Sequence, residues 1–353
     1  MNVWIRPILL FFSQIIFYFY FLVSNLVLIL VVVNQSELAE PAIHKQNKFS
    51  VHQANSVPTK YEQQVIQVDL PKKHAGVGLA RKIGMDEAVR CFEQQQKDGI
   101  IICYDADCTC RPDYLQSIWT NYDRKKLNLG LVHYEHDLDG PNEEGIINYE
   151  LYLRYYNNGL RVADYPFAVQ TLGSCITVRS SVYQKQGGMN RRKAGEDFYF
   201  IHKCMPLGAV GEINDTCIYP SDRISDRVPF GTGHAINRYL EDRDESYPVY
   251  HYSTFEDLKH ININLNDLWK TGTLTALPES IVRFYSENSF DDSLRKIRDQ
   301  AGSMQNFKQR YYAWWDGFRV LKFIHFCRDH HYQKIPLTEA LNWLDDQLMG
   351  LDF

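Results

Sequence analysis

Two aspartates directly follow an apolar run in the first third of the chain. Gly99 to Tyr104 is typical of a buried strand, and Asp105-Ala106-Asp107 comes next. Because side chains alternate along a strand, we expect Asp105 and Asp107 to point to the same side. Carboxylates suit Mg²⁺ or Mn²⁺, which proteins hold together with substrate phosphates. The pair predicts a metal site for a diphosphate-bearing substrate, the alternative being that both residues only end the strand and cap a turn.

A second acidic pair, Glu196-Asp197, follows Gly195 at the predicted start of a helix. Acidic residues in a first helical turn often do no more than meet the positive end of the helix dipole. A carboxylate held there can also act as a general base on a hydroxyl group. With the first acidic pair upstream, the sequence favours the functional interpretation.

Basic residues lie in glycine-rich loops near both acidic pairs: Arg191, Arg192 and Lys193 before Glu196, and Arg223 and Arg227 further on. Arginine forks onto phosphate oxygens, so contacts with phosphate or a leaving group are one interpretation and solvated surface charge is the other. His234 is a candidate metal ligand, although a lone histidine is more often structural.

Strands and helices alternate around these motifs. We expect a strand at Leu26 to Val33, a helix from about residue 74 to 96, and the strand before Asp105. Such alternation predicts an α/β fold with a mostly parallel sheet that binds ligands at the carboxyl ends of its strands. Residues 38 to 73 are expected to form a helix and an exposed connection, and the chain beyond about residue 250 to be helical, with Tyr311 to Trp315 in its core.

The N-terminal tract is apolar from Ile8 to Val33 apart from four polar residues. It is long enough to cross a bilayer, yet its second half has the β-branched composition of a buried strand. Both interpretations stay open, and residues 1–25 are expected to make a possible peripheral membrane contact on a protein that is otherwise cytoplasmic.

Composition limits the class of protein. The 353 residues are 45% hydrophobic and 23% charged, as in ordinary globular proteins. A net charge of -5 does not favour nucleic acid as a partner. The eight cysteines form no C-x-x-C pair, so we expect mostly reduced, buried thiols.

The order of motifs resembles that of family 2 type glycosyltransferases of the GT-A fold, the nucleotide-diphospho-sugar transferases. The match runs over roughly residues 26 to 235, through the glycine-rich helix start at Gly76, the D-x-D motif, and Gly187-Gly188-Met189 leading to Glu196-Asp197. The resemblance implies a Rossmann-like, mostly parallel sheet flanked by helices in residues 26–240. A helical C-terminal region, residues 241–353, would extend it.

The resemblance also implies an inverting, metal-dependent hexosyl transfer from a nucleotide-sugar donor to a glycan or lipid-linked acceptor. It assigns Asp197 as catalytic base, Asp107 to Mg²⁺ or Mn²⁺ and Asp105 to the donor. Beside these residues we expect Glu196 next to the base and His234 at the metal. We expect the other candidates to face the donor (Arg81, Arg223 and Arg227) or the acceptor (Gly173, Ser174, Arg191 and Arg192).

Two rival functions stay open at this point. Asp105-Ala106-Asp107-Cys108-Thr109 also fits the D-x-D-x-T signature of haloacid dehalogenase type phosphatases, which would make Asp105 a nucleophile. The chain lacks that family's second metal motif at Gly195 to Phe200. A non-catalytic pseudo-transferase that binds a sugar nucleotide is the other alternative.

Overall fold

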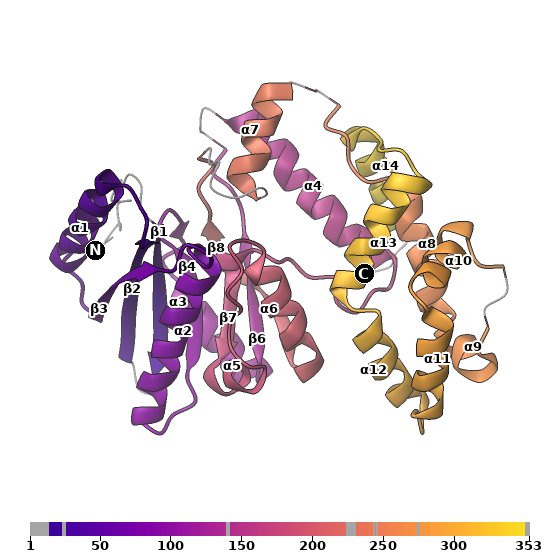
Figure 1. The fold of residues 1–353 in the computed structure, drawn as a ribbon, viewed down its shortest axis with the longest axis horizontal. Helices are drawn as coiled ribbons and strands as arrows, with labels where there is room; N and C mark the ends of the chain where they lie inside the picture. Colours follow the sequence, from indigo (N-terminus) through magenta and orange to yellow (C-terminus); the bar gives the residue numbers. More distant parts are fainter. Residues whose placement is uncertain are drawn as a thin grey trace. The chain divides into compact units, whose positions relative to one another are not determined.

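The computed structural model describes residues 14–22, 26–138, 142–223, 231–242, 244, 246–273 and 276–349. The described residues divide into two compact units. The first comprises residues up to 143 together with 171–234, and the second comprises residues 144–170 and 235–353. The chain is a mixed α/β protein, with a sheet in the first unit and helices in the second (Figure 1).

The first unit is built on one eight-stranded sheet with the strand order β3-β2-β1-β4-β7-β6-β8-β5 (Figure 1). The strands, in chain order, are β1 Gln14–Leu22, β2 Leu26–Ser36, β3 Glu62–Leu70, β4 Ile100–Asp105, β5 Thr109–Cys110, β6 Leu129–Tyr134, β7 Ile176–Arg179 and β8 Val210–Tyr219. The predicted strands at Leu26 and before Asp105 are confirmed as β2 and β4. An exposed connection was expected within residues 38–73, and this expectation is wrong where the chain forms β3. This strand lies at the edge of the sheet, and its polar, partly exposed side chains lack the pattern of a buried strand.

The sheet is mixed, so the expectation of a mostly parallel sheet is wrong. Five of its pairings are antiparallel and two, β2 with β3 and β6 with β8, are parallel. The reason is that β1 and β7 run opposite to the neighbours between which they are inserted, and β5 runs opposite to β8. From these pairings β2, β3, β4, β6 and β8 point the same way, and their carboxyl ends therefore lie along one edge of the sheet.

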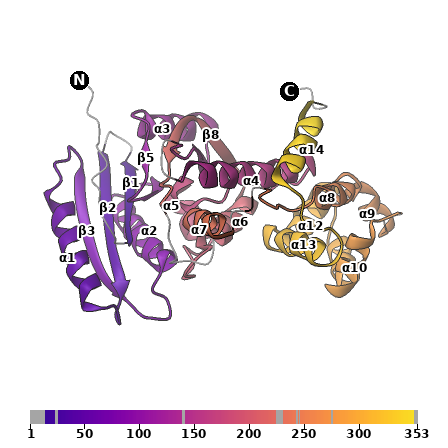
Figure 2. The ribbon, with the colours of Figure 1, turned by 90° about the horizontal axis from the view of Figure 1, so that it is seen from above.

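Helices cover both faces of this sheet. Alternate β2 residues from Val27 to Val33 pack with Ala54 of α1 (Pro41–Ser56) on one face. Helix α2 (Val77–Gln94) contacts β1, β2 and β4, and Figure 2 shows it on the other side of the sheet from α1. The other helical segments of this unit are α3 Tyr114–Lys125, the short 3-10 turn Gly173–Cys175, α5 Ser180–Lys185, α6 Glu196–Cys204 and a second 3-10 turn Met205–Leu207.

The expected membrane contact of the N-terminal tract is contradicted. Gln14–Leu22 form β1, which pairs over its whole length with β2 and over six residues with β4. Among the described residues no helix has both the length and the apolar character that a membrane crossing requires. Hydropathy could not separate the two readings because a strand inside a covered sheet is as apolar as a membrane segment. Residues 1–13 and 23–25 of the tract lie outside the described part of the chain.

A proline in the middle of β1 is expected to destabilise the protein. Tyr18 is paired with Leu30 on one side and Cys103 on the other, so Tyr18→Pro removes a ladder donor within the sheet. We expect a loss of about 2 kcal/mol or more in the free energy of unfolding, measured by urea denaturation. Tyr18→Val is the matched control because it also loses the ring but keeps the N–H group. Equal urea midpoints for both variants would show that β1 is not part of the sheet.

The second unit is helical, as the sequence predicted beyond residue 250. Its core is rich in aromatic residues, and Phe307, Tyr311 and Trp315 are fully buried there. The predicted core role of the cluster that begins at Tyr311 is thereby confirmed for its two inward residues. Its helices are α4 Glu143–Val162, α7 Thr232–Asp242, α8 Ser253–Ile263, α9 Leu265–Thr271, α10 Glu279–Glu287, α11 Phe290–Asp299, α12 Met304–Trp314, α13 Gly317–His330 and α14 Leu337–Met349.

Candidate active site

Arg81 of α2 meets Asp105 at the carboxyl end of β4. Nη2 of Arg81 donates to Oδ1 of Asp105 at 2.6 Å. One helical turn further along α2, the sulfur of Met85 lies 4.0 Å from that of Cys103. Four residues of helix rise about 6 Å and two residues of strand about 6.6 Å, so the two contacts keep the same spacing along antiparallel elements. Asp105 therefore faces α2 because it shares the sheet face of Cys103.

Glycines at the start of α2 bring the second acidic pair to the same place. A Cβ added at Gly76 would lie 2.8 Å from Cα of Lys193, and one at Gly78 would overlap the carbonyl oxygen of Arg192. The loop before α6 can thus rest directly on the backbone of α2. As a result Glu196 reaches Arg81, 115 residues earlier in the chain, and accepts from its Nη1.

Gly173 completes the packing around the guanidinium group of Arg81. It opens the 3-10 turn before β7, and a Cβ added there would overlap Nη1 of Arg81. The neighbouring Ser174 is buried. Gly173, expected on the acceptor side, therefore gives room to a buried arginine.

The electrostatics of this cluster are dominated by one guanidinium among three carboxyl groups. Arg81 is 2% exposed. Burial alone lowers its pKa, but Asp105 and Glu196 hold that pKa well above its ordinary value. Burial raises the pKa of Glu196 to about 7, with Arg81 opposing the shift and Asp197 adding to it. Burial likewise raises the pKa of the Asp197 carboxyl group.

Asp197 is placed by the start of α6. Gly195, with a φ of 69°, adopts the left-handed conformation just before the helix. Oδ1 of Asp197 accepts from the backbone N–H of Phe198 at 2.7 Å. Asn190 donates to the carbonyl oxygen of Glu196 at 2.8 Å and ties the loop to the helix. The carboxyl group of Asp197 is thus oriented while its residue stays partly exposed.

Asp107 has a different partner from Asp105. Nη2 of Arg223 lies 2.8 Å from Oδ2 of Asp107, and both side chains are about one-third exposed, at 37% and 34%. The strand ends at Asp105, and a turn closed by the N–H of Cys108 to the carbonyl of Asp105 follows. Strand alternation therefore stops before Asp107, and the two aspartates form ion pairs with different arginines.

A hollow of about 440 Å³ lies at the same edge of the sheet. It is lined by the first residue of β5, the last residue of β8 and three residues that follow β6: Thr109, Tyr219, His136, Asp137 and Leu138. Apart from Thr109, none of these residues belongs to the motifs that the sequence singled out. The signal was present, because β6 is an apolar run that leads into His-Tyr-Glu-His-Asp just as β4 leads into Asp105.

The structure does not join the other predicted residues to the Arg81 cluster. Arg191 is exposed, and the guanidinium group of Arg192 lies over the ring of Tyr199 at 3.7 Å. His234 lies near the start of α7, and among the described residues no bond links it to Asp107. Arg227 lies outside the described residues.

Comparisons with known proteins give only weak matches. No protein-family model matches the chain. No curated protein matches it either. The solved structures to which it is similar include S. aureus TarS 1-349 in complex with UDP-GlcNAc, at 11% identity and a TM-score of 0.39 over 80% of this chain and 82% of that one. Another is S. aureus TarS at 12% identity and a TM-score of 0.36, covering 84% of this chain and 49% of that one. A likeness this low carries no information about activity.

Proposed function

We propose that the chain is a metal-dependent, inverting glycosyltransferase that moves a sugar from a nucleotide-diphosphate donor to a hydroxyl group of a glycan or other acceptor. The observation that carries this proposal is the Arg81 cluster. It brings the aspartate that ends β4 and the acidic pair that begins α6 to one side of the sheet, at the carboxyl ends of parallel-running strands. This edge is where ligands bind in open α/β sheets.

Asp107 is the proposed ligand for Mg²⁺ or Mn²⁺. Its side chain is 34% exposed, and carboxylate oxygen is the donor that a hard divalent ion prefers. Arg223 now pairs with this carboxylate, so the ion would have to take the place of the guanidinium group. Such an ion, when bound, neutralises charge on the departing nucleoside diphosphate. Arg223 is then available to the diphosphate oxygens, which its guanidinium group suits.

Asp197 is the proposed general base. Asp197 is a partly exposed residue, and its carboxylate can accept the proton of an acceptor hydroxyl as that oxygen attacks the anomeric carbon. Glu196 is proposed as a positioning residue, because it is 2% exposed and engaged by Arg81. Arg81 also holds Asp105, so one buried cation orders both acidic motifs.

Asp107→Asn tests the metal dependence. In the unchanged protein we expect Mn²⁺ to strengthen binding of one member of a panel of UDP-, GDP- and dTDP-sugars, UDP-GlcNAc among them, measured by titration calorimetry. The variant should lose this metal-dependent gain of at least about tenfold, because an amide cannot supply an anionic ligand. Asp123→Asn is the control, since Asp123 is a surface residue of α3 with a 68% exposed side chain. A metal effect that survives in Asp107→Asn would refute this assignment.

A further inference from the structure

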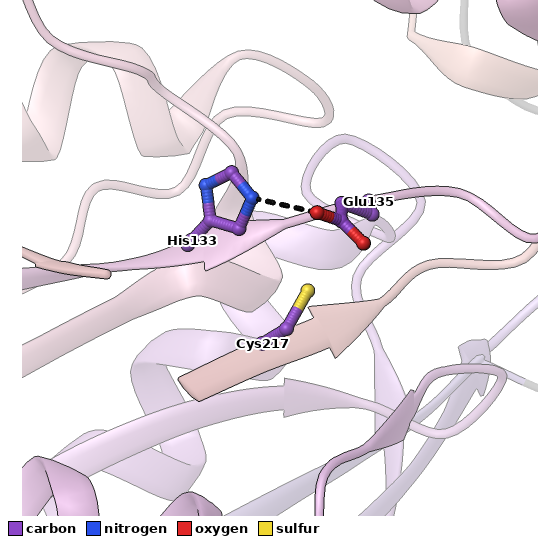
Figure 3. Close-up of side chains that lie close together, drawn as sticks. All are labelled: His133, Glu135 and Cys217. Carbon is purple, nitrogen blue, oxygen red and sulfur yellow. Dashed lines mark hydrogen bonds and ion pairs between the residues drawn. The ribbon is translucent and has the colours of Figure 1, made fainter. Parts of the chain in front are cut away.

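Three side chains of metal-binding type converge where β6 and β8 end. His133 lies on β6, Glu135 directly follows it, and Cys217 lies on β8 (Figure 3). One ligand atom from each lies within 4.8 Å of the others. Nε2 of His133 is 3.1 Å from Oε1 of Glu135. None of the three belongs to the Arg81 cluster or lines the hollow.

The strand pairing explains why two of these side chains share a side. The N–H of Glu135 donates to the carbonyl oxygen of Ile218 at 3.1 Å, so the ladder with β8 continues past the end of β6. His133 and Glu135, two residues apart on this extended segment, therefore point the same way.

A bulge in β8 brings Cys217 to them. Val132 pairs with Ile213 and Tyr134 with Ile218, so one residue of β6 lies opposite four residues of β8. Bulges of this kind redirect side chains.

Other elements hold the bulge in place. Arg111 donates its N–H to the carbonyl oxygen of Cys217 at 3.1 Å. Thr216 donates to Asp113 at 2.8 Å, and Asn121 donates to Asp215 at 2.8 Å. These bonds tie three consecutive bulge residues to one segment, residues 111–121, so the position of Cys217 is built into the fold.

We propose that His133, Glu135 and Cys217 bind a zinc-type divalent cation, with the fourth coordination position taken by water. Nitrogen, carboxylate oxygen and sulfur together are the donors Zn²⁺ uses in proteins, whereas Mg²⁺ and Mn²⁺ prefer oxygen. Tetrahedral zinc bonds of about 2.0–2.3 Å place ligand atoms roughly 3.3–3.8 Å apart. Glu135 can adjust to this spacing because its side chain is 54% exposed. On binding, the Cys217 thiol releases its proton to solvent.

Such an ion would join the end of β6 to the β8 bulge. Glu135 is followed by His136 and Asp137, and Cys217 precedes Tyr219 by two residues, so the site adjoins the hollow along both strands. The proposal does not depend on the glycosyltransferase function and would hold for a protein with no such activity.

Cobalt provides the direct test, since Co²⁺ substitutes for zinc and reports its ligands by absorption. The full chain, freed of metal with a chelator, should bind one equivalent of Co²⁺ with a thiolate-to-metal charge-transfer band, and Zn²⁺ should abolish that band. In Cys217→Ser the band should vanish, and Zn²⁺ affinity should fall by more than the roughly 10- to 100-fold typical of lost outer-shell partners. Cys204→Ser, which removes another buried thiol of the same unit, should leave both unchanged.

Further variants keep the proposal testable if Cys217→Ser does not fold. His133→Gln and Glu135→Gln alter side chains that are 27% and 54% exposed, so both should fold. The proposal is supported if His133→Gln loses stoichiometric Zn²⁺ binding while Asp107→Asn, which alters the other proposed metal ligand, keeps it. A charge-transfer band that is absent from the unchanged protein, or full Zn²⁺ affinity in His133→Gln, overturns it.

Discussion

Replacing Arg81 by methionine is expected to lower the free energy of unfolding by about 3–5 kcal/mol, the usual cost of leaving buried partners of an ion pair uncompensated. Arg81 is 2% exposed and is the cation shared by Asp105 and Glu196. Urea denaturation measures the loss. Lys82→Met is the matched control, because the Lys82–Asp86 pair one residue away is more exposed and such pairs contribute about 0–1 kcal/mol.

Gly173→Ala should reproduce part of this loss without touching a charge. The added methyl group overlaps Nη1 of Arg81, so the guanidinium group must move away from Glu196. Full stability in both Gly173→Ala and Arg81→Met would mean that Arg81 does not organise the cluster.

The cost of Arg81→Met should depend on pH. The pKa of Glu196 is raised to about 7 from an ordinary value of 4.5, so protonated Glu196 is the form the fold favours. The stability that protonated Glu196 contributes is fully present below about pH 4.5 and is lost as the pH rises through 7. Without Arg81 the charged form is disfavoured further, and the stability difference between the two proteins should therefore widen as pH rises across this window.

Asp197→Asn is expected to reduce turnover by roughly 10² to 10⁴ while leaving donor binding unchanged, the scale of a lost general base. Nucleotide release in the presence of acceptor measures turnover, and calorimetry measures binding. Because burial raises the pKa of Asp197, the proposed activity of the unchanged protein should be lost on acidification at a higher pH than an ordinary aspartate would give. The neighbouring Glu196→Gln should cost less activity, since its amide oxygen still accepts from Arg81. Loss of donor binding in Asp197→Asn would assign that residue to the metal or to the fold instead.

Much of the candidate site could be predicted from local sequence. Five apolar residues before Asp105 specify a covered strand with a polar end, and β4 has that form. The 3.6-residue period after Gly76 specifies α2, and Gly195 before Glu196 specifies the start of α6. In each case the pattern and the structure it predicts span the same few residues, and no distant contact is needed to form them.

The partners of these residues could not be predicted in the same way. Asp105 pairs with Arg81, whereas Asp107, two residues later, pairs with Arg223, because the strand ends between them. Strand β3 was missed because an edge strand buries little, and its glutamines carry no hydrophobic alternation. The hollow beyond β6 was missed because its residues come from three separate strands.

By itself, the sequence determined which residue types stand at the ends of strands and helices, since apolar period and glycine position act over a few residues. Only the tertiary structure decided which of them meet. The order of strands placed β1 between β2 and β4, although its hydropathy suited a membrane equally well. Close backbone approach at Gly78 brought Glu196 to Arg81, and a bulge in β8 brought Cys217 to His133. The last two contacts join residues 115 and 84 positions apart, and they form only when the sheet and the helices that cover it pack together.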